Sequence, residues 1–342
     1  MTDADAWEAA FGSNGSSLAN RFNFPVPAVI ANAGPVAREK YIEYFTATIR
    51  NANTRRAYAV AVNRMLGWCD RHGIALPALR PTIVATYIEE LMRTVSPATV
   101  KQHLAAIRDF CDYLVLGQVL PTNPCHAVRG PKHVVKSGKT PVLTQQQARE
   151  LLDSIEVAHV HPLTGQVTAN LIGLRDRALI AMMIYSFARI GAAVSMNVED
   201  YWQNGKRWWF RLHEKGGKHH AVPAHHNAEQ YLDAYLQATG IADQLKSPLF
   251  RTIPGHGGDV SDRRMTRNDA LAMIKRRAKA AGMPRGTCCH TFRATGITAY
   301  LRGGGVLENA QTIAAHESPR TTRLYDRRSD EISPGEIERI VI

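Results

Sequence analysis

Apolar side chains recur at helical spacing in the first third of the chain, beyond about residue 36. Apolar positions three or four residues apart mark the buried face of a helix. The stretches with this pattern run from Ala57 to Trp68, from Ile83 to Leu91 and from Val100 to Leu114. Thr54 and the pair Ser96 and Pro97 are typical of helix starts. The pattern predicts an all-helical domain over residues 37–130.

Two segments without this periodicity flank the helical domain. Residues 1–36 are rich in Gly, Ser, Asn, Ala and Pro, which is typical of a flexible tail. Residues 131–142 are rich in Pro, Gly and Lys and predict a flexible linker. Lys132 and Lys136 make this linker basic, so it is suited to run along a phosphate backbone. A second domain is therefore expected over residues 143–342.

The second domain combines helices with a short β pattern. Thr144 is a good cap for a helix that starts at Gln145. Further helices are predicted over residues 174–187, 229–245 and 268–281. Strands are predicted over residues 198–202, 207–212 and 221–223. Asn204 and Gly205 predict a hairpin turn between the first two strands. The expected fold class is mostly α with a small antiparallel β-sheet.

The length and charge of the chain indicate which classes of molecule it could bind. A chain of 342 residues is long enough for two domains with real cores. The formal net charge of +12 makes a polyanion the natural partner. Nucleic acid is favoured over a membrane because no strongly amphipathic basic helix stands out. Charge alone decides little, since many basic chains are simply basic.

The cysteines indicate a reducing compartment. They are odd in number and form no C-x-x-C pair, which is typical of free thiols in a cytosolic protein. The N-terminal residues carry acid and lack a basic and then apolar run, so no secretory signal is expected. The apolar run 181–187 is too short to cross a bilayer. We expect a cytoplasmic protein that associates with the nucleoid when it is bound to DNA.

The segment from Cys288 to Arg328 carries the candidate chemistry. His290 and Arg293 are three positions apart, so a helix over this segment would present both side chains on one face. His316 precedes Tyr325 by nine positions, and Ser318 could cap a short helix begun by Pro319 between them. Imidazole, guanidinium and phenol groups together suit chemistry on a phosphodiester.

This arrangement resembles the C-terminal signature of the tyrosine recombinases, or phage integrase family. The run His290-Thr291-Phe292-Arg293-Ala294-Thr295 is similar to the family's H-x-x-R box. Ala315-His316-Glu317-Ser318 is similar to its Gly-His box, with Ala in place of Gly. Tyr325 stands where the family has its nucleophile. The resemblance spans residues 40 to 330 and implies a two-domain clamp, with a helical core-binding domain and an α/β catalytic domain.

Two more boxes of the family have counterparts upstream. Ala188-Arg189-Ile190-Gly191-Ala192 resembles the first catalytic box, in which Glu usually stands where this chain has Ala192. We consider that a carboxylate from elsewhere, such as Glu199, orients Arg189 instead. The run Glu214-Lys215-Gly216-Gly217-Lys218 resembles the β-hairpin that carries a catalytic lysine, which implies Lys215 with Lys218 as the alternative. Outside this context such a run is usually a solvated turn.

The resemblance implies catalysis without a cofactor or a metal. Arg189 and Arg293 would bind the non-bridging oxygens, where negative charge accumulates during attack. His316 would donate a hydrogen bond to the phosphate. Because a phenol has a pKa of about 10, Tyr325 needs a nearby base and a positive field to attack at neutral pH.

The proton transfers fall to two other side chains. His290 would accept the tyrosine proton and return it, and Lys215 would protonate the departing 5′ oxygen. A covalent 3′-phosphotyrosine link would conserve the bond energy, so strands could be cut and rejoined without ATP. The implied activity is site-specific recombination of duplex DNA, in integration, excision or resolution.

The same resemblance implies a DNA-bound assembly. The candidate DNA contacts are Arg55, Arg56, Lys101, Lys132, Lys136 and Lys218. For Arg55, Arg56 and Lys101 a solvated surface is an equal alternative. The expected partners are double-stranded DNA sites, accessory DNA-bending proteins and further copies in a homo-tetramer. The C-terminal helix, with Ile337, Ile340 and Val341, would dock on a neighbouring copy or fold back on its own domain.

Three other interpretations of these residues are possible besides recombination. A type IB topoisomerase-like enzyme shares the chemistry and relaxes DNA as a monomer. A DNA-binding protein without catalysis is kept open by Ala192. A zinc site is disfavoured, because adjacent residues on a strand point to opposite faces. The histidines considered for it are His213, His219, His220, His225 and His226.

Overall fold

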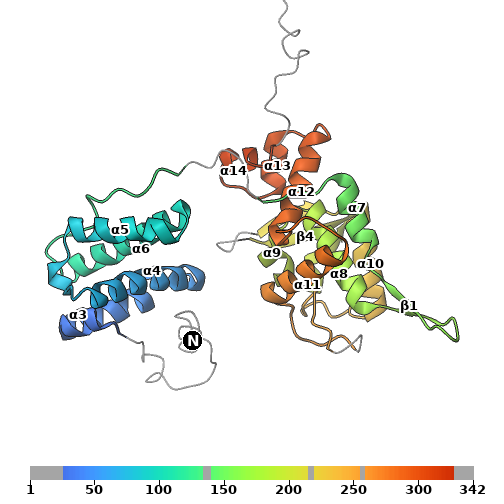
Figure 1. Cartoon of the computed structure of the whole chain (residues 1–342). Coiled ribbons are helices and arrows are strands. Elements are labelled where there is room, and N and C mark those ends of the chain that lie inside the picture. The colour runs from blue at the N-terminus through green and yellow to red at the C-terminus, as the bar shows by residue number, and fades with distance from the viewer. Residues whose placement is uncertain (1–25, 134–139, 215–218, 255–258, 327–342) are drawn as a thin grey trace, which may run out of the picture. The chain divides into compact units, whose positions relative to one another are not determined.

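The computed structural model describes residues 26–133, 140–214, 219–254 and 259–326. The chain divides into two compact units, Met1–Val134 and Val135–Ile342, and each is described by itself (Figure 1). The described residues are mostly helical, with small antiparallel sheets, as the sequence predicts.

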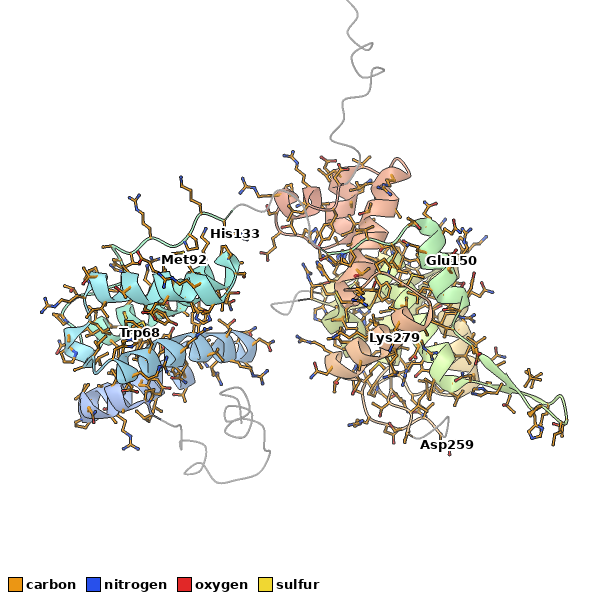
Figure 2. All side chains as sticks on the ribbon, in the orientation of Figure 1. Trp68, Met92, His133, Glu150, Asp259 and Lys279 are labelled. Atoms are coloured by element: carbon orange, nitrogen blue, oxygen red, sulfur yellow. The ribbon has the colours of Figure 1, made fainter. Side chains whose placement is uncertain are left out.

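Unit 1 is an all-helical bundle. Its helices are α2 (Ala28–Asn32), α3 (Pro35–Glu43), the π-helix η2 (Tyr44–Thr48), α4 (Ala52–Arg71), the 3-10 turn η3 (Leu76–Ala78), α5 (Pro81–Thr94) and α6 (Pro97–Leu116). Its core includes the aromatic cluster Tyr41, Tyr44, Phe45 and Phe110, in which the rings of Phe45 and Phe110 lie 6.3 Å apart and each contacts both tyrosines, with ring centroids 4.9 to 6.0 Å apart. Trp68 lies inside this bundle, as Figure 2 shows.

Several local expectations in unit 1 need correction. Residues 28–32, expected in the flexible tail, form α2, and Val29 and Ile30 of this helix are buried. The helix α4 begins before Thr54, because the Asn51 side chain accepts hydrogen bonds from the backbone of Asn53 and Thr54. Ser96 caps α6 as predicted.

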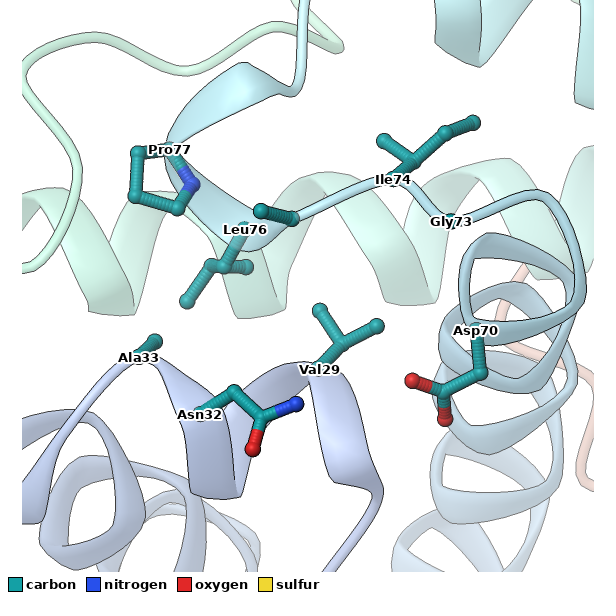
Figure 3. Close-up of a pocket in the computed structure, with 9 residues that line it drawn as sticks. Val29, Asn32, Ala33, Asp70, Gly73, Ile74, Leu76 and Pro77 are labelled. Atoms are coloured by element: carbon teal, nitrogen blue, oxygen red, sulfur yellow. The ribbon is translucent and has the colours of Figure 1, made fainter.

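A cavity of about 410 Å³ lies in unit 1, between α2, the end of α4 and η3 (Figure 3). Val29 and Leu76 face it from the apolar side, and Asn32 and Asp70 add polar groups at its edge. None of the predicted catalytic residues lines it.

Unit 2 combines helices with two small sheets. Its helices are α7 (Gln145–Asp153), α8 (Leu171–Tyr185), α9 (Ile190–Ser195), the 3-10 turn η4 (Val198–Asp200), α10 (His226–Thr239), α11 (Arg267–Ala280), α12 (Cys289–Arg302), α13 (Leu307–Ile313) and α14 (Pro319–Arg323). The helix α8 is buried along most of its length and packs against α10 and α12. Glu150 on α7 and Lys279 on α11 lie on the exposed faces of their helices (Figure 2).

A buried charge cluster joins α8 to α11. Asp176 is fully buried and accepts hydrogen bonds from Arg175 at 2.7 Å and from Arg277 at 3.0 Å. Arg175 also donates to the backbone oxygen of Arg251 at 3.0 Å. Because a lone buried charge is costly, these pairs hold the two helices in one arrangement.

The larger sheet has the predicted antiparallel order β3-β4-β5. Its strands are β3 (Tyr201–Asn204), β4 (Arg207–His213) and β5 (His219–Pro223). Asn204 pairs with Arg207, so the tight turn consists of Gly205 and Lys206, one position later than expected. Gly205 has φ +63°, a conformation in which glycine is favoured.

Two further features of unit 2 differ from the sequence expectations. A second hairpin, β1 (Ala158–Val160) with β2 (Val167–Ala169), was not predicted and projects from the unit (Figure 1). The helix expected to reach residue 245 ends at Thr239, where Gly240 adopts the left-handed conformation and terminates it. Within the described ranges, no helix is both long and apolar enough to cross a membrane.

Candidate active site

The helix α12 positions the central residues of the site. Gly296 allows this helix to pack closely on the end of α8, because an added Cβ would lie 1.9 Å from the Ile184 backbone oxygen. Thr295 accepts a hydrogen bond from the Leu143 backbone at 3.0 Å, and Thr298 donates to the Tyr325 backbone oxygen at 2.9 Å. The same helix therefore holds the segment that carries Tyr325.

Arg293 lies at the centre of the site and is 1% exposed. Its guanidinium donates hydrogen bonds to the backbone oxygens of Phe187 and Ala314. Burial, together with the positive charge of Arg189, lowers the pKa of Arg293 to about 10, while Glu214 and Tyr325 act in the opposite direction. Arg293 thus stays protonated at neutral pH, as a cation held by two fixed carbonyl groups.

Tyr325 follows α14 and is buried, with 7% of its surface exposed. Its hydroxyl and the Nε2 atom of His290 are 2.5 Å apart, within hydrogen-bond distance. Its ring stacks on that of His316, with centroids 5.7 Å apart and an interplanar angle of 10°. Burial raises the pKa of Tyr325, whereas the charges of Arg293 and Arg189 lower it.

Both histidines of the site are held in the neutral form at pH 7. The surrounding protein desolvates the His290 ring and lowers its pKa, and the charges of Arg293 and Arg189 add to this effect. Burial and the same two charges lower the pKa of His316 to about 3. The Nδ1 atom of His316 lies 2.9 Å from the Thr322 hydroxyl. A neutral His290 can accept a proton from the Tyr325 hydroxyl.

Arg189 is the N-cap residue of α9, without a capping bond from its side chain, and it pairs with Glu214, which follows β4. The proposed partner Glu199 is wrong, since it pairs instead with Lys246 at 2.7 Å on the surface. Ala192 is buried at 3% exposure and carries no polar group. The sequence analysis missed Glu214 as a partner, although this residue directly precedes the predicted Lys215.

The structure therefore brings most of the predicted catalytic side chains into one place. Arg189, His290, Arg293, His316 and Tyr325 are linked by the contacts and electrostatic effects above. The predicted Lys215 lies outside the described residues.

The predicted DNA contacts are placed less uniformly. Arg56, Lys101 and Lys132 are exposed. Arg55 donates two hydrogen bonds to the Ile49 backbone oxygen, at 2.8 and 3.1 Å, and so stabilises the start of α4. The remaining positions named for DNA or protein contacts lie outside the described residues, namely Lys136, Lys218, Ile337, Ile340 and Val341.

The histidines near the hairpin have structural partners. His213 pairs with buried Asp200 at 2.9 Å, and His220 lies 3.0 Å from the Ile313 backbone oxygen, which joins β5 to α13. His225 caps α10. Among the residues whose positions are described, no three His, Cys, Asp or Glu side chains gather as metal ligands.

Two family models match the chain. The phage integrase family matches residues 141–331, more than half of the chain, and the phage integrase N-terminal SAM-like domain matches residues 39–118. These matches cover the catalytic boxes and the helical bundle respectively.

Curated relatives are Xer recombinases. The chain is 27% identical over 247 residues to tyrosine recombinase XerC of Chlamydia pneumoniae, covering 72% of this chain and 73% of the relative. It is 25% identical over 298 residues to tyrosine recombinase XerD of Chlorobaculum tepidum, covering 84% of this chain and 90% of the relative.

Solved structures share the fold. The XerH site-specific recombinase bound to palindromic difH substrate has a TM-score of 0.66 at 16% identity, covering 86% of this chain and 82% of that one. A lambda integrase tetramer bound to a Holliday junction has a TM-score of 0.64 at 16% identity, covering 96% and 87%. With more than half of its length matched by the family model, the chain belongs to the phage integrase family, the tyrosine recombinases.

Proposed function

We propose that this protein is a site-specific recombinase that cleaves and rejoins duplex DNA through a covalent bond between Tyr325 and a 3′ phosphate. The observation that carries the proposal is the hydrogen bond between the Tyr325 hydroxyl and His290, beside the cations Arg293 and Arg189. A nucleophile, a neutral base and two phosphate-binding groups are what this reaction requires.

The step balances without an outside reactant. The Tyr325 oxygen bonds to phosphorus as the bond from phosphorus to the 5′ oxygen breaks, and the phenol proton passes to His290 Nε2. The departing 5′ oxygen takes a proton from Lys215. One phosphodiester is exchanged for another, so the reverse attack by a 5′ hydroxyl can seal a new strand. These reaction steps require no metal or cofactor.

Arg189 and Arg293 stabilise the charge that develops on the non-bridging oxygens. A preorganised donor of this kind contributes about a hundredfold or more in rate. Arg293 is anchored by two backbone oxygens, so it needs little reorganisation when the phosphate arrives. His316, stacked on the nucleophile, has its second ring nitrogen available to donate to a phosphate oxygen.

The biological assembly follows from the reaction. Exchange between two duplexes needs four active sites, so we propose a tetramer on paired sites in the cytoplasm, assisted by accessory DNA-bending proteins and held together by the C-terminal segment that includes Ile337 and Ile340. A lambda integrase structure is such a tetramer on a Holliday junction.

A suicide substrate tests the proposal. The wild-type protein and Tyr325→Phe are incubated with nicked duplexes made from DNA that flanks the gene, and SDS-resistant adducts are mapped. We expect adducts only with the wild type, attached at a 3′ phosphate. A wild-type protein that binds these duplexes without any adduct would identify a DNA-binding protein without catalysis. Adducts together with relaxation of supercoiled plasmid and no recombinant product would favour a type IB topoisomerase activity.

A further inference from the structure

The first arginine of the site has an unusual carboxylate partner. The family's first catalytic box usually has Glu three residues after this arginine, whereas this chain has Ala192, which is buried and apolar. Glu214, on a different element and 25 positions further along the chain, pairs with Arg189 instead. We propose that Glu214 is the positioning residue of Arg189, so the carboxylate has moved from the helix α9 to the end of the strand β4.

Strand geometry places Glu214 on the correct side. Side chains alternate along a strand, so residue 214 continues the face of Phe210 and Leu212, which are both fully buried. The strand β4 packs against α9, whose N-cap residue is Arg189. The Glu214 carboxylate therefore lies on the buried side of the sheet, where it contacts the Arg189 side chain at the start of α9.

The exposure of the two side chains fits a positioning role. The Glu214 side chain is 5% exposed, while that of Arg189 is 39% exposed. The carboxylate bonds the Nη1 atom of Arg189, which leaves Nε and Nη2 as donors for a phosphate. A buried acceptor thus holds one nitrogen of the guanidinium, while the Arg189 side chain as a whole keeps enough exposed surface for a phosphate to reach it.

Glu214 also acts on the second arginine. Its negative charge raises the pKa of Arg293, against the effects of burial and of Arg189. One carboxylate therefore supports both phosphate-binding cations. Glu199, once the alternative, cannot have this role, because it is paired with Lys246 on the surface.

The test rests on the proposed cleavage activity and compares Glu214→Gln, Glu214→Asp and the surface control Glu199→Gln. Single-turnover cleavage of a nicked suicide duplex is measured, and the dissociation constant for DNA is measured in a Tyr325→Phe background. We expect Glu214→Gln to slow cleavage by about 10- to 100-fold, the effect typical of groups that orient a site residue. We expect DNA affinity to change by less than about threefold, since the exposed edge of Arg189 remains. Glu199→Gln should cleave like the wild type.

A neutral substrate separates positioning from a merely structural role. If Glu214 acts by aiming Arg189 at phosphate charge, a methylphosphonate at the scissile position should reduce its importance, because one charged oxygen is replaced by a methyl group. The wild type and Glu214→Gln should then differ by less than about threefold. Equal slowing on both substrates, or wild-type rates for Glu214→Gln on the phosphodiester, would overturn the proposal.

Two controls keep the outcome decisive. If Glu214→Gln does not fold, Glu214→Asp replaces it in the test. This variant keeps the negative charge, but its side chain is one methylene shorter, so the carboxylate should no longer reach Arg189. Cleavage by Glu214→Asp at the wild-type rate would also overturn the proposal. The wild-type adduct is measured in parallel. Its absence would refute the proposed function itself, whereas a normal adduct with an insensitive Glu214 would refute only the role of this residue.

Discussion

Gly296 provides a sharp structural test, because its absence of a side chain sets the distance between α12 and α8. A Cβ at this position would lie 1.9 Å from the Ile184 oxygen and 2.7 Å from the Phe187 ring. The nearest atom is backbone, which cannot rotate away. In Gly296→Ala the helix α12 must therefore move until that contact grows from 1.9 Å to at least 3.0 Å, a movement of about 1.1 Å.

The cost has two parts. Alanine favours a helix over glycine by about 1 kcal/mol, while overpacking a core costs about 1–3 kcal/mol. Because this contact is with backbone, the overpacking cost should be at the upper end, about 3 kcal/mol. After the helix gain of about 1 kcal/mol, we expect a net loss of about 2 kcal/mol in the free energy of unfolding. Arg293 lies one turn earlier on the same helix, and a displacement of about 1 Å in a site can cost about a hundredfold in rate.

The assay compares Gly296→Ala with Gly67→Ala, a glycine inside α4 of unit 1. An added Cβ at Gly67 meets only Arg71 Nη1, at 3.7 Å, which is ordinary contact. Urea unfolding should show Gly67→Ala stabilised by about 0.5–1 kcal/mol and Gly296→Ala destabilised. Single-turnover cleavage should fall only in Gly296→Ala. A Gly296→Ala protein with wild-type stability and cleavage would refute the close-packing argument.

Further predictions concern protons and salt. His316 has a folded pKa of about 3 against about 6.5 when unfolded, so the unfolded state binds more protons between these values and stability falls as the pH drops below 6.5. From pH 7 to pH 5 the wild type should lose about 2 kcal/mol more than His316→Gln in urea unfolding, and equal losses would contradict this. Lys101→Ala should reduce the slope of log affinity against log salt by about one, whereas Arg55→Ala should chiefly destabilise unit 1, whose Ile49 oxygen loses its donors. Because the pKa of His290 is lowered in the free protein, the cleavage rate at subsaturating DNA should fall on the acidic side only below pH 6.5. At saturating DNA this fall should begin at a higher pH. A fall that begins at a lower pH with saturating DNA would contradict the assignment of His290 as the base.

Local sequence signals predicted the parts of the site that lie within one element. The spacing of His290 and Arg293 on one helix, and the Ser318 cap before Pro319, follow from backbone geometry over a few residues. The same holds for the apolar stripe of α6, whose predicted residues from Val100 to Leu114 are buried. Short-range geometry is nearly independent of the rest of the fold, so such patterns are reliable.

Partner choice across the fold was not predictable in this way. Glu199 and Glu214 follow Arg189 in the chain, and the sequence does not show which carboxylate folds next to it. In the structure it is Glu214, directly after β4, that pairs with Arg189. Likewise Asn51, not Thr54, caps α4, although both residues have side chains that can cap a helix. The hairpin formed by β1 and β2 did leave a signal, since Thr164 and Gly165 interrupt an alternating run, with Gly165 at φ +67°.

From the electrostatics of the free protein we infer that bound DNA would complete the proposed catalytic site. Arg189 and Arg293 lower the pKa of His290, which keeps the base neutral but also weakens it. A bound phosphate would bring negative charge next to the same two cations and offset their effect on the imidazole, so under the proposed mechanism the pKa of His290 rises when DNA binds. The tyrosine, whose pKa burial raises, remains protonated and unreactive until then. A protein that must not cut DNA at random thus has its base strengthened by the phosphate that is to be attacked.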